Sequence, residues 1–382
     1  MSLKQVYIVR TARYFPNSPV MNEEMEKYLG YVNGQASKMK GIVLRNNGIK
    51  KRYYALTSEG KVTHTNAQMT SLAIRELVKS ADIDLKSIPL ITCGTSSPDQ
   101  IMPSHGVMVH GWLPESAAAE VITPSGNCCA SLHALKYAYL AIKSGEVDLA
   151  ICTGSERFSC ILKSDHYEDE IEKLAQMEAN PRLAFEKDFL RWMLSDGACA
   201  FLLSDKPARS GLSLKIDWLV GASYAHLAET CMYMGGEKEK DGSLKSYMEF
   251  DQQELLDKSI FTIKQDVRLL DANIVPYGYD KLRSVLETKG LTVDDFDYFL
   301  PHLSSEYFRG KISEILKDNG MEIPQEKWFT NLSYTGNVGA ASPFLMIDEI
   351  MTSGKLKKGD KLLLMVPESA RFSYIYGSLT VV

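Results

Sequence analysis

The chain has 382 residues and a mass of 42.7 kDa, with 45% hydrophobic and 24% charged residues. This composition is ordinary for a soluble globular protein, and the length favours two fused units over one small domain. The net charge of −5 is spread along the chain and argues against a nucleic-acid-binding protein. We expect no membrane span, because no run approaches about eighteen apolar residues, and no secretory signal at the N-terminus.

The use of cysteine favours a reducing compartment. The number of cysteines, seven, is odd, and no two have the spacing of a CxxC motif or a metal site. Free thiols are typical of the cytoplasm, whereas small secreted proteins pair their cysteines. We therefore expect a cytoplasmic protein without a disulfide framework. The cysteines are Cys93, Cys128, Cys129, Cys152, Cys160, Cys199 and Cys231.

The N-terminal half alternates strand-like and helix-like runs. Such alternation predicts β-α-β units whose helices cover a buried sheet. The expected strands are residues 6–15, 89–94 and 147–155, and the expected helices are residues 21–32, 66–83 and 130–145.

Two further segments suggest where the chain divides. Residues 164–191 are strongly charged and helix-prone, and we expect them to be a solvated insertion. Residues 207–251 carry short segments that contain Gly and Met, which we expect to be loops and a strand that link the halves. The predicted halves are residues 1–206 and residues 207–382.

The second half repeats features of the first. Gly145 lies 17 residues after Cys128, and Gly354 lies 17 residues after Asn337, with an apolar helix-like run in each interval. Upstream, PLITCG resembles YFLPHLSS, which contains His302. Repeated βα units at matched spacing indicate an internal duplication, although two βα units can also resemble each other by chance. A duplication would place Cys128, His302 and Asn337 at corresponding ends of two half-sites.

These three residues offer complementary chemistry. Cys128 sits where a glycine-containing turn enters a helix, so unpaired N–H groups and the helix dipole favour its thiolate and can hold an oxyanion. His302 follows a strand-like run, at the end of a strand where α/β folds place their sites. Asn337 opens an apolar helix. Each has a structural alternative, namely a buried inert cysteine, a core histidine and a simple N-cap, but together they form a more specific set.

The sequence resembles the thiolase-fold condensing enzymes, and among them the β-ketoacyl-acyl-carrier-protein synthase III type. GNCCASLHAL is similar to the nucleophile segment of that family, FLPHLSS to its Pro-His segment and TGNVGAASPFLMIDE to its Gly-Asn segment. IVLRNNGIKKRYY, TSSPDQIMPSHG and SDGACAFLLS resemble three further family elements. The resemblance implies a thiolase-like α/β fold, in which two duplicated βα halves form five layers, α-β-α-β-α.

The resemblance also implies an activity. This is an acyltransferase of fatty acid or lipid metabolism that carries out a decarboxylative Claisen condensation without a metal or organic cofactor. Cys128 would carry the acyl group, and His302 and Asn337 would stabilise the enolate left by a malonyl thioester. The implied partners are an acyl-carrier protein, acyl and malonyl thioesters, CoA thioesters and, in a homodimer, a second copy of the chain. Met102 would be presented to the acyl pocket of that copy.

Several positions depart from the family's pattern. Gly41 stands where the family often has a tryptophan that stacks on the adenine of CoA. The family's Gly-rich loop, which helps to form the oxyanion hole, reads ESARFSY here, and we expect Phe372 or Ser373 to supply the backbone donor. A basic cluster is expected to dock an acidic carrier protein, with a solvated basic turn as the alternative. Its residues are Arg45, Lys50, Lys51, Arg52 and Arg309.

Three related functions stay open as alternatives. Hydroxymethylglutaryl-CoA synthases use a glutamate base near the TSS segment, where this chain offers only Asp99. Non-catalytic partner subunits of condensing enzymes typically lack the nucleophile, which here is Cys128. A ketosynthase-cyclase that joins two β-ketoacyl thioesters, as in dialkylresorcinol formation, is compatible with the altered C-terminal loop.

Overall fold

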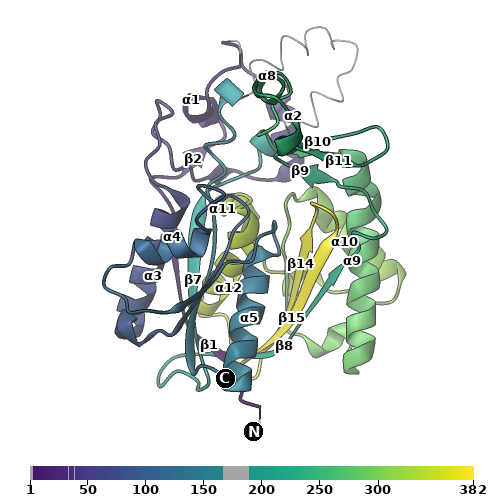
Figure 1. The fold of residues 1–382 in the computed structure, drawn as a ribbon. Coiled ribbons are helices and arrows are strands. Elements are labelled where there is room, and N and C mark those ends of the chain that lie inside the picture. Colours follow the sequence, from purple (N-terminus) through teal and green to yellow (C-terminus); the bar gives the residue numbers. More distant parts are fainter. Residues whose placement is uncertain (1–2, 33, 38, 167–188) are drawn as a thin grey trace.

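The computed structural model describes residues 3–32, 34–37, 39–166 and 189–382 (Figure 1). Its strands are β1 (Tyr7–Tyr14), β2 (Val20–Met21), β3 (Lys51–Arg52), β4 (Leu90–Gly94), β5 (Glu120–Ile122), β6 (Leu149–Glu156), β7 (Gly197–Ser204), β8 (Leu214–Ser223), β9 (Met232–Tyr233), β10 (Gly236–Lys238), β11 (Leu244–Ser246), β12 (Lys264–Gln265), β13 (Tyr298–Pro301), β14 (Lys361–Glu368) and β15 (Ser373–Val381). Its α-helices are α1 (Met25–Leu29), α2 (Lys40–Asn47), α3 (Asn66–Ala81), α4 (His105–Gly111), α5 (Ala130–Ser144), α8 (Gln252–Asp257), α9 (Val267–Lys289), α10 (Tyr307–Asp318), α11 (Leu332–Thr335) and α12 (Ser342–Thr352).

One nine-stranded sheet organises the molecule, in the order β13-β14-β15-β8-β1-β7-β6-β4-β5. On its N-terminal side, β1 to β7 and β7 to β6 are antiparallel, and β6 to β4 is parallel. On its C-terminal side, β8 to β15 and β15 to β14 are antiparallel, and β14 to β13 is parallel. The two sides meet where β1 pairs with β8 over two residue pairs. The same pairing order therefore occurs on both sides of this junction.

The helices form three layers around the two sides of the sheet. Helices α5 and α12 lie in the middle, and their apolar side chains share one core with strands of both sides (Figure 1). Helices α3 and α4 cover the N-terminal side, whereas α9 packs on β14 and β15 of the C-terminal side and α10 packs on α9. This is the α-β-α-β-α arrangement of a thiolase-like fold. No helix among the described residues has both the length and the apolar content to span a membrane.

Local sequence explains where the long helices begin and end. Thr65 and Gln68 form a capping box at the start of α3, which satisfies backbone N–H groups that the helix leaves free. Gly145 adopts φ +84°, a left-handed conformation that suits glycine, and it ends α5. The helix expected at 21–32 is shortened to α1, because Gly30 with φ +82° stops it.

The charged segment 164–191 is only partly described. Residues 167–188 lie outside the described part of the chain. Arg191, at the end of the expected insertion, is buried, and its guanidinium donates hydrogen bonds to the backbone carbonyls of Gly30 (2.7 Å) and Leu162 (2.9 Å). The expectation of a solvated segment is therefore wrong for this end, because backbone carbonyls around Arg191 satisfy its charge inside the core.

Candidate active site

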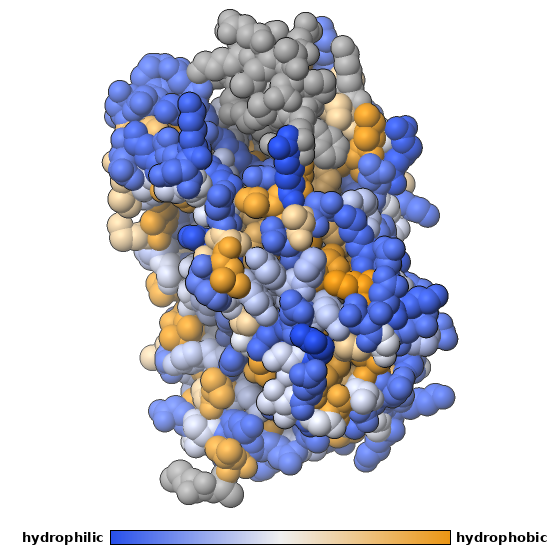
Figure 2. All heavy atoms as spheres, turned by 90° about the vertical axis from the view of Figure 1, so that its right-hand side faces the viewer, coloured by the Kyte–Doolittle hydropathy of each residue, from blue (hydrophilic) through white to orange (hydrophobic). Residues whose placement is uncertain are grey.

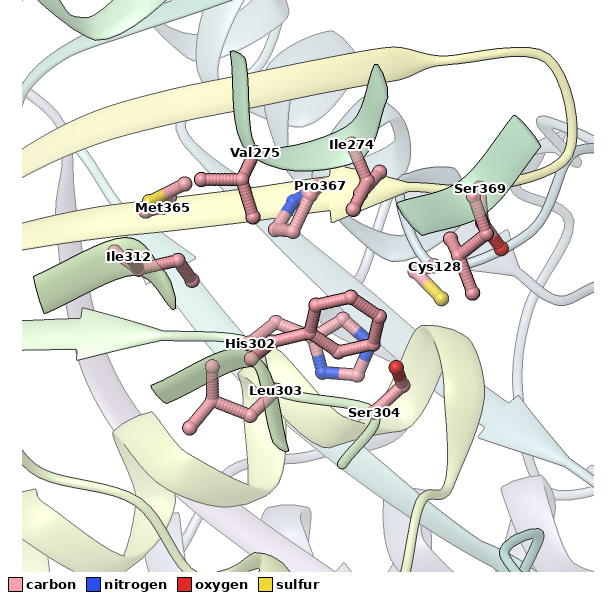
Figure 3. Close-up of a pocket in the computed structure, with 12 residues that line it drawn as sticks. Cys128, Ile274, Val275, His302, Leu303, Ser304, Ile312, Met365, Pro367 and Ser369 are labelled. Carbon is pink, nitrogen blue, oxygen red and sulfur yellow. The ribbon is translucent and has the colours of Figure 1, made fainter. Parts of the chain in front are cut away.

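Cys128 lies in the turn that leads into α5. The helix begins at Ala130 with Cys129 as its N-cap residue, so the Cys128 thiol stands just before the first turn. The half-buried side chain lines two small cavities of about 30 Å³ each. Figure 3 shows it on the wall of the first cavity, across from His302. Cys128 is thus in a position to react with a group in either cavity.

Its neighbour Cys129 has a different environment. Cys129 is fully buried, and its Sγ donates a hydrogen bond to the carbonyl of Val366 at 3.3 Å. Adjacent residues at the start of a helix point in different directions. Of the two thiols, Cys128 lines both of these cavities and Cys129 lines neither.

His302 follows directly after β13. Its backbone N–H donates to the carbonyl of Met365 at 2.8 Å, which continues the pairing of β13 with β14 and fixes the residue at the strand end. The ring lines the first cavity, and its Nε2 has no hydrogen-bond partner among the described residues. Burial lowers the pKa of His302 to about 4. The imidazole is therefore neutral near pH 7 and can present one ring N–H to a ligand.

Asn337 lines the second cavity together with Cys128. Its backbone N–H donates to the carbonyl of Met193 (3.1 Å), and its carbonyl accepts the N–H of Ser195 (2.9 Å). Its Oδ1 accepts the N–H of Gly339 at 3.0 Å. These contacts fix the amide so that Nδ2, which donates to no described residue, remains as the donor for a ligand.

The electrostatics of the thiol differ from the sequence expectation. Burial raises the pKa of Cys128 well above its usual range, and the carboxylates of Glu368 and Glu156 raise it further. The positive end of α5 does not offset this, because a carboxylate oxygen of Glu368 already accepts N–H groups there. The resting state is therefore a thiol and not the expected thiolate.

Two buried glutamates beside these turns were not singled out from the sequence. Glu156 ends β6 and Glu368 ends β14. Glu156 accepts hydrogen bonds from the hydroxyls of Ser96 and Ser97 and from the N–H of Ala340, and burial raises its pKa to about 7. The sequence does carry a signal for both, since each glutamate ends the buried strand that follows a special turn.

Two larger cavities adjoin the small ones. A cavity of about 300 Å³ shares with the Asn337 cavity the residues Ser96, Asn127, Phe158, Met232 and Ile263. A cavity of about 480 Å³ shares Leu270 and Phe308 with the His302 cavity. Helices α9 and α10 lie on the face seen in Figure 2, where hydrophobic side chains gather near the middle of a mostly hydrophilic surface. Through these shared residues, the two larger cavities border the two small ones that Cys128 lines.

The expected oxyanion donors, Phe372 and Ser373, do not line the two cavities at Cys128. Phe372 is fully buried with φ +58°, and Ser373 begins β15. Neither is among the described residues that line the two cavities at Cys128, whereas Ser369 lines both (Figure 3). That Phe372 or Ser373 supplies the backbone donor therefore stays a prediction, which their place outside these two cavities disfavours.

The basic cluster is also only partly on the surface. Arg45 and Lys50 are exposed and Lys51 is half-buried. Arg52 is fully buried and donates hydrogen bonds to Asn22 Oδ1 (2.8 Å) and the carbonyl of Trp192 (3.3 Å), so it cannot dock a carrier.

Arg309 and Met102, the remaining predicted residues, lie at the surface. Arg309 pairs with Glu306 at 2.6 Å, so part of its charge is neutralised. Met102 is 83% exposed, away from the Cys128 cavities of its own chain.

Two family models match the parts of the chain that carry this site, one containing Cys128 and the other containing His302 and Asn337. Residues 116–208 match the β-ketoacyl synthase N-terminal domain, and residues 286–367 match the C-terminal domain of 3-oxoacyl-[acyl-carrier-protein] synthase III. The β-ketoacyl-[acyl-carrier-protein] synthase III of Bradyrhizobium sp. (strain BTAi1) is 25% identical over 100% of this chain and 99% of its own. That of Clostridium novyi is 25% identical over 94% of each chain. The chain is a thiolase-fold condensing enzyme of the β-ketoacyl-acyl-carrier-protein synthase III type.

Solved structures agree with this fold. The tetronic acid condensing enzyme AbyA1 superposes with a TM-score of 0.76 at 18% identity, covering 98% of this chain and 99% of its own. The 3-oxoacyl-[acyl-carrier-protein] synthase III of Aquifex aeolicus gives a TM-score of 0.71 at 21% identity, with the same coverage. OleA of Xanthomonas campestris with bound lauric acid and lauroyl-CoA gives 0.74 at 18% identity, covering 99% of each chain. These structures support the fold, while the synthase III relatives and the matched β-ketoacyl synthase domain make this condensing enzyme an acyltransferase.

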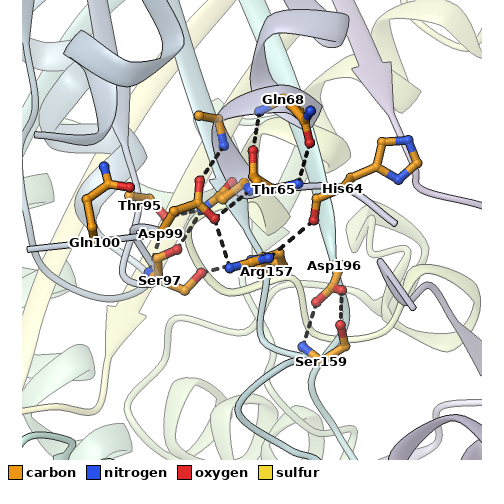
Figure 4. Close-up of polar contacts among 12 residues, drawn as sticks. His64, Thr65, Gln68, Thr95, Ser97, Asp99, Gln100, Arg157, Ser159 and Asp196 are labelled. Carbon is orange, nitrogen blue, oxygen red and sulfur yellow. Dashed lines mark hydrogen bonds and ion pairs between the residues drawn. The ribbon is translucent and has the colours of Figure 1, made fainter. Parts of the chain in front are cut away.

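In this condensing enzyme Asp99 caps helix α3 and binds Arg157. Its carboxylate accepts the N–H groups of Asn66 and Ala67 at the start of α3, both at 2.9 Å, and it forms an ion pair with Arg157 at 2.9 Å (Figure 4). It is not among the described residues that line the cavities at Cys128. This placement disfavours the hydroxymethylglutaryl-CoA synthase alternative, in which a carboxylate near the TSS segment acts as base.

Proposed function

We propose that this condensing enzyme joins an acyl group held on Cys128 to the two-carbon unit of a malonyl or related thioester, with loss of carbon dioxide. The observation that carries the proposal is that Cys128 lines both small cavities, with His302 on one and Asn337 on the other. A nucleophile flanked by two neutral hydrogen-bond donors suits a reaction that passes through an enolate.

The first step is acyl transfer. The Cys128 sulfur attacks the carbonyl carbon of an acyl thioester, and the bond from that carbon to the carrier sulfur breaks. The thiol proton goes to the departing carrier sulfur, so the carrier leaves as a free thiol. Because the resting thiol has a raised pKa, this proton transfer accompanies the attack and does not precede it.

The second step forms the carbon–carbon bond. The thioester oxygen of the malonyl group accepts hydrogen bonds from the His302 ring and from Asn337 Nδ2. When the bond to the carboxylate breaks and carbon dioxide leaves, the electron pair of that bond stays on the malonyl group as an enolate, which these two donors stabilise. The enolate carbon attacks the acyl carbonyl, the bond to Cys128 sulfur breaks, and a β-ketoacyl thioester is released. The departing sulfur takes up a proton from solvent, which restores the resting thiol.

The acyl group in the proposal is longer than acetyl. The cavity of about 300 Å³ beyond the Asn337 cavity offers room for an apolar chain between Phe158, Met232 and Ile263. The similarity to OleA, whose structure holds lauric acid and lauroyl-CoA, supports this chain length. The donor in the proposal is an acyl-carrier protein, with CoA thioesters as poorer donors.

The proposed setting is a cytoplasmic homodimer. All seven cysteines are free thiols, which suits a reducing compartment. Ile101 and Met102 are 70% and 83% exposed, and such exposed apolar side chains gain from burial against a second copy. Met102 would then contact the acyl pocket of that copy.

A ketosynthase-cyclase reaction is the second candidate. The similarity to AbyA1, a tetronic acid condensing enzyme, supports a ring-forming product, and the altered C-terminal loop ESARFSY is compatible with one. In that case, two β-ketoacyl thioesters would occupy the cavities on either side of Cys128.

Product analysis tests both reactions. The enzyme is incubated with a medium-chain acyl-carrier protein and malonyl-carrier protein, and the products are identified by mass spectrometry. A β-ketoacyl carrier extended by two carbons, absent with Cys128→Ala, is the expected result. A cyclic product formed only from two β-ketoacyl carriers would establish the second candidate. A parent protein that never becomes acylated would instead indicate a non-catalytic partner subunit.

A further inference from the structure

The end of β14 places a carboxylate against the turn that carries the nucleophile. Glu368 Oε2 accepts the backbone N–H of Asn127 at 2.9 Å and the backbone N–H of Cys129 at 3.1 Å. These are the two residues on either side of Cys128. The Cys128 N–H, between them, donates to no other described residue, and its contact is with the Cys128 thiol itself. Glu368 itself is buried, with 8% of its surface exposed.

We propose that Glu368 is a positioning residue for the Cys128 nucleophile, because its carboxylate holds the N–H groups on both sides of Cys128. With these two groups bound, the Cys128 N–H between them stays available for the oxyanion formed during acyl transfer. The inference rests on the proposed role of Cys128 and assigns a task to the loop that replaces the family's Gly-rich segment.

Glu368 also contacts the turn at its glycine. Gly126 adopts φ +150°, and a side-chain carbon added there would lie 3.5 Å from Glu368 Oε2. The carboxylate therefore packs closely on the turn as well as bonding to it. Helix N-termini stabilise acceptors of this kind, since their first N–H groups have no partner within the helix. One side chain of β14 thus fixes both ends of a three-residue segment in front of α5.

The same contact brings a negative charge close to the thiol. The titratable groups around Cys128 are Glu368 from β14, Glu156 from β6, His302 after β13 and Cys129 beside it. His302 is neutral near pH 7, so the two glutamates act on the thiol as charges once they are ionised; burial raises the pKa of both. Both oppose ionisation of Cys128. Removing the charge of Glu368 while keeping its contacts should therefore make the thiolate easier to form.

Two substitutions separate the contact from the charge. In Glu368→Gln, the side-chain oxygen can still accept both N–H groups, but the charge is gone. In Glu368→Asp, the charge stays, but a side chain shorter by one methylene cannot reach both N–H groups. Glu322→Gln, at an exposed site, is the matched control for loss of a carboxylate.

The pH dependence of Cys128 alkylation by iodoacetamide tests the electrostatic part without requiring any enzymatic activity. The modified residue is identified by peptide mass analysis. We expect Glu368→Gln to shift the alkylation profile down by about one pH unit, which is roughly a tenfold faster reaction near pH 7. Glu368→Asp and Glu322→Gln should keep the parental profile. An unshifted profile in Glu368→Gln would overturn the proposal.

Acyl transfer tests the positioning part. We expect Glu368→Asp to transfer the acyl group to Cys128 at least about tenfold more slowly than Glu368→Gln, as a loss of kcat with little change of KM. Equal rates in the two variants would overturn the positioning role. If the alkylation profiles shift as expected but no thioester acylates Cys128 even in the parent, the proposed function fails while the contact between Glu368 and the turn stands.

Discussion

The Oε1 atom of Glu156 accepts the backbone N–H of Ala340 at 3.0 Å, so the end of β6 holds the turn that carries Asn337. Glu368 makes the reverse connection, from the end of β14 to the turn that carries Cys128. Each glutamate, at the end of a strand on one side of the sheet, therefore binds the turn on the other side that carries a candidate site residue. The relative position of Cys128 and Asn337 depends on both contacts.

Glu156 should make the stability of the protein depend on pH. Burial raises its pKa from the ordinary 4.5 to about 7 in the folded state. A raised folded-state pKa means that its contribution to stability is complete below pH 4.5 and is lost as the pH rises through 7. We expect the free energy of unfolding of the parent, relative to Glu156→Gln, to fall by roughly 3 kcal/mol over this range.

Denaturant unfolding between pH 4.5 and 8 measures this difference. The exposed Glu322→Gln serves as the control, and its difference from the parent should be flat with pH. Buried His302 and His105 have lowered pKa values and act in the opposite direction, so the comparison must be made between variants and not on the parent alone. A parent-to-Glu156→Gln difference that does not change with pH would contradict the prediction.

Cys128, and not Cys129, should carry the acyl group. Cys128 lines two cavities, while the Cys129 sulfur is buried and bonded to the carbonyl of Val366. We expect Cys128→Ala to abolish labelling by an acyl thioester, whereas Cys129→Ala should keep the label on Cys128. Peptide mass mapping after incubation with the thioester distinguishes the two, and label found only on Cys129 would refute the assignment.

The sequence predicts those parts of the fold that depend on residues close together in the chain, and it fails where distant residues meet. The helices α3 and α5 were predicted nearly to their ends, because Thr65 with Gln68 and Gly145 are local signals at their boundaries. The short α1 was overestimated, because the left-handed Gly30 carries no apolar signal. The division at residues 206 and 207 stays a prediction, supported by the strand pairing repeated on both sides of the sheet.

The candidate site shows the same limit. Cys128, His302 and Asn337 could be singled out because a duplicated spacing marks them along the chain. The raised pKa of Cys128 could not, because it arises first from burial of the thiol in the folded chain and then from the carboxylates of Glu368 and Glu156. Glu368 is 239 residues away from Cys129 in sequence but accepts its N–H. The burial of Arg52 was missed for a similar reason, since its partner Trp192 lies far along the chain.

His302 and Asn337 should matter more for decarboxylation than for acylation. In the proposed reaction the His302 ring and Asn337 Nδ2 are neutral donors to a thioester oxygen, and neither side chain is hydrogen-bonded to Cys128. We expect His302→Ala and Asn337→Ala each to lower decarboxylation of a malonyl thioester by about a hundredfold or more, while acylation of Cys128 persists. Release of labelled carbon dioxide measures the first step and mass analysis the second. Parental decarboxylation in both variants would show that this division of roles is wrong.

Restoring an aromatic side chain at position 41 should improve the use of CoA. Gly41 lies on α2, is exposed, and a side-chain carbon added there meets no atom within 4 Å. Stacking on an adenine contributes about 1 kcal/mol, so Gly41→Trp should raise kcat/KM for acyl-CoA roughly fivefold. The same acyl group on acyl-pantetheine, which has no adenine, is the control and should show no gain. An equal gain with both donors would mean that stacking is not the cause.

Docking of the acyl carrier should depend on the exposed part of the basic cluster. Arg45 and Lys50 are exposed, and Asn46, next to Arg45, lines the cavity of about 480 Å³ that leads towards His302. Charges at the rim of an interface act mainly on the association rate and are screened by salt. We expect the double variant Arg45→Ala, Lys50→Ala to lower kcat/KM for an acyl-carrier protein roughly three- to tenfold at low salt. At high salt the parent and the variant should have the same kcat/KM.

Lys358→Ala, at another exposed site, is the control and should follow the parent at both salt concentrations. Because acyl-pantetheine lacks the acidic protein, its transfer should be equal in all three proteins. A double variant that uses the carrier as well as the parent does at low salt would move the docking surface away from α2.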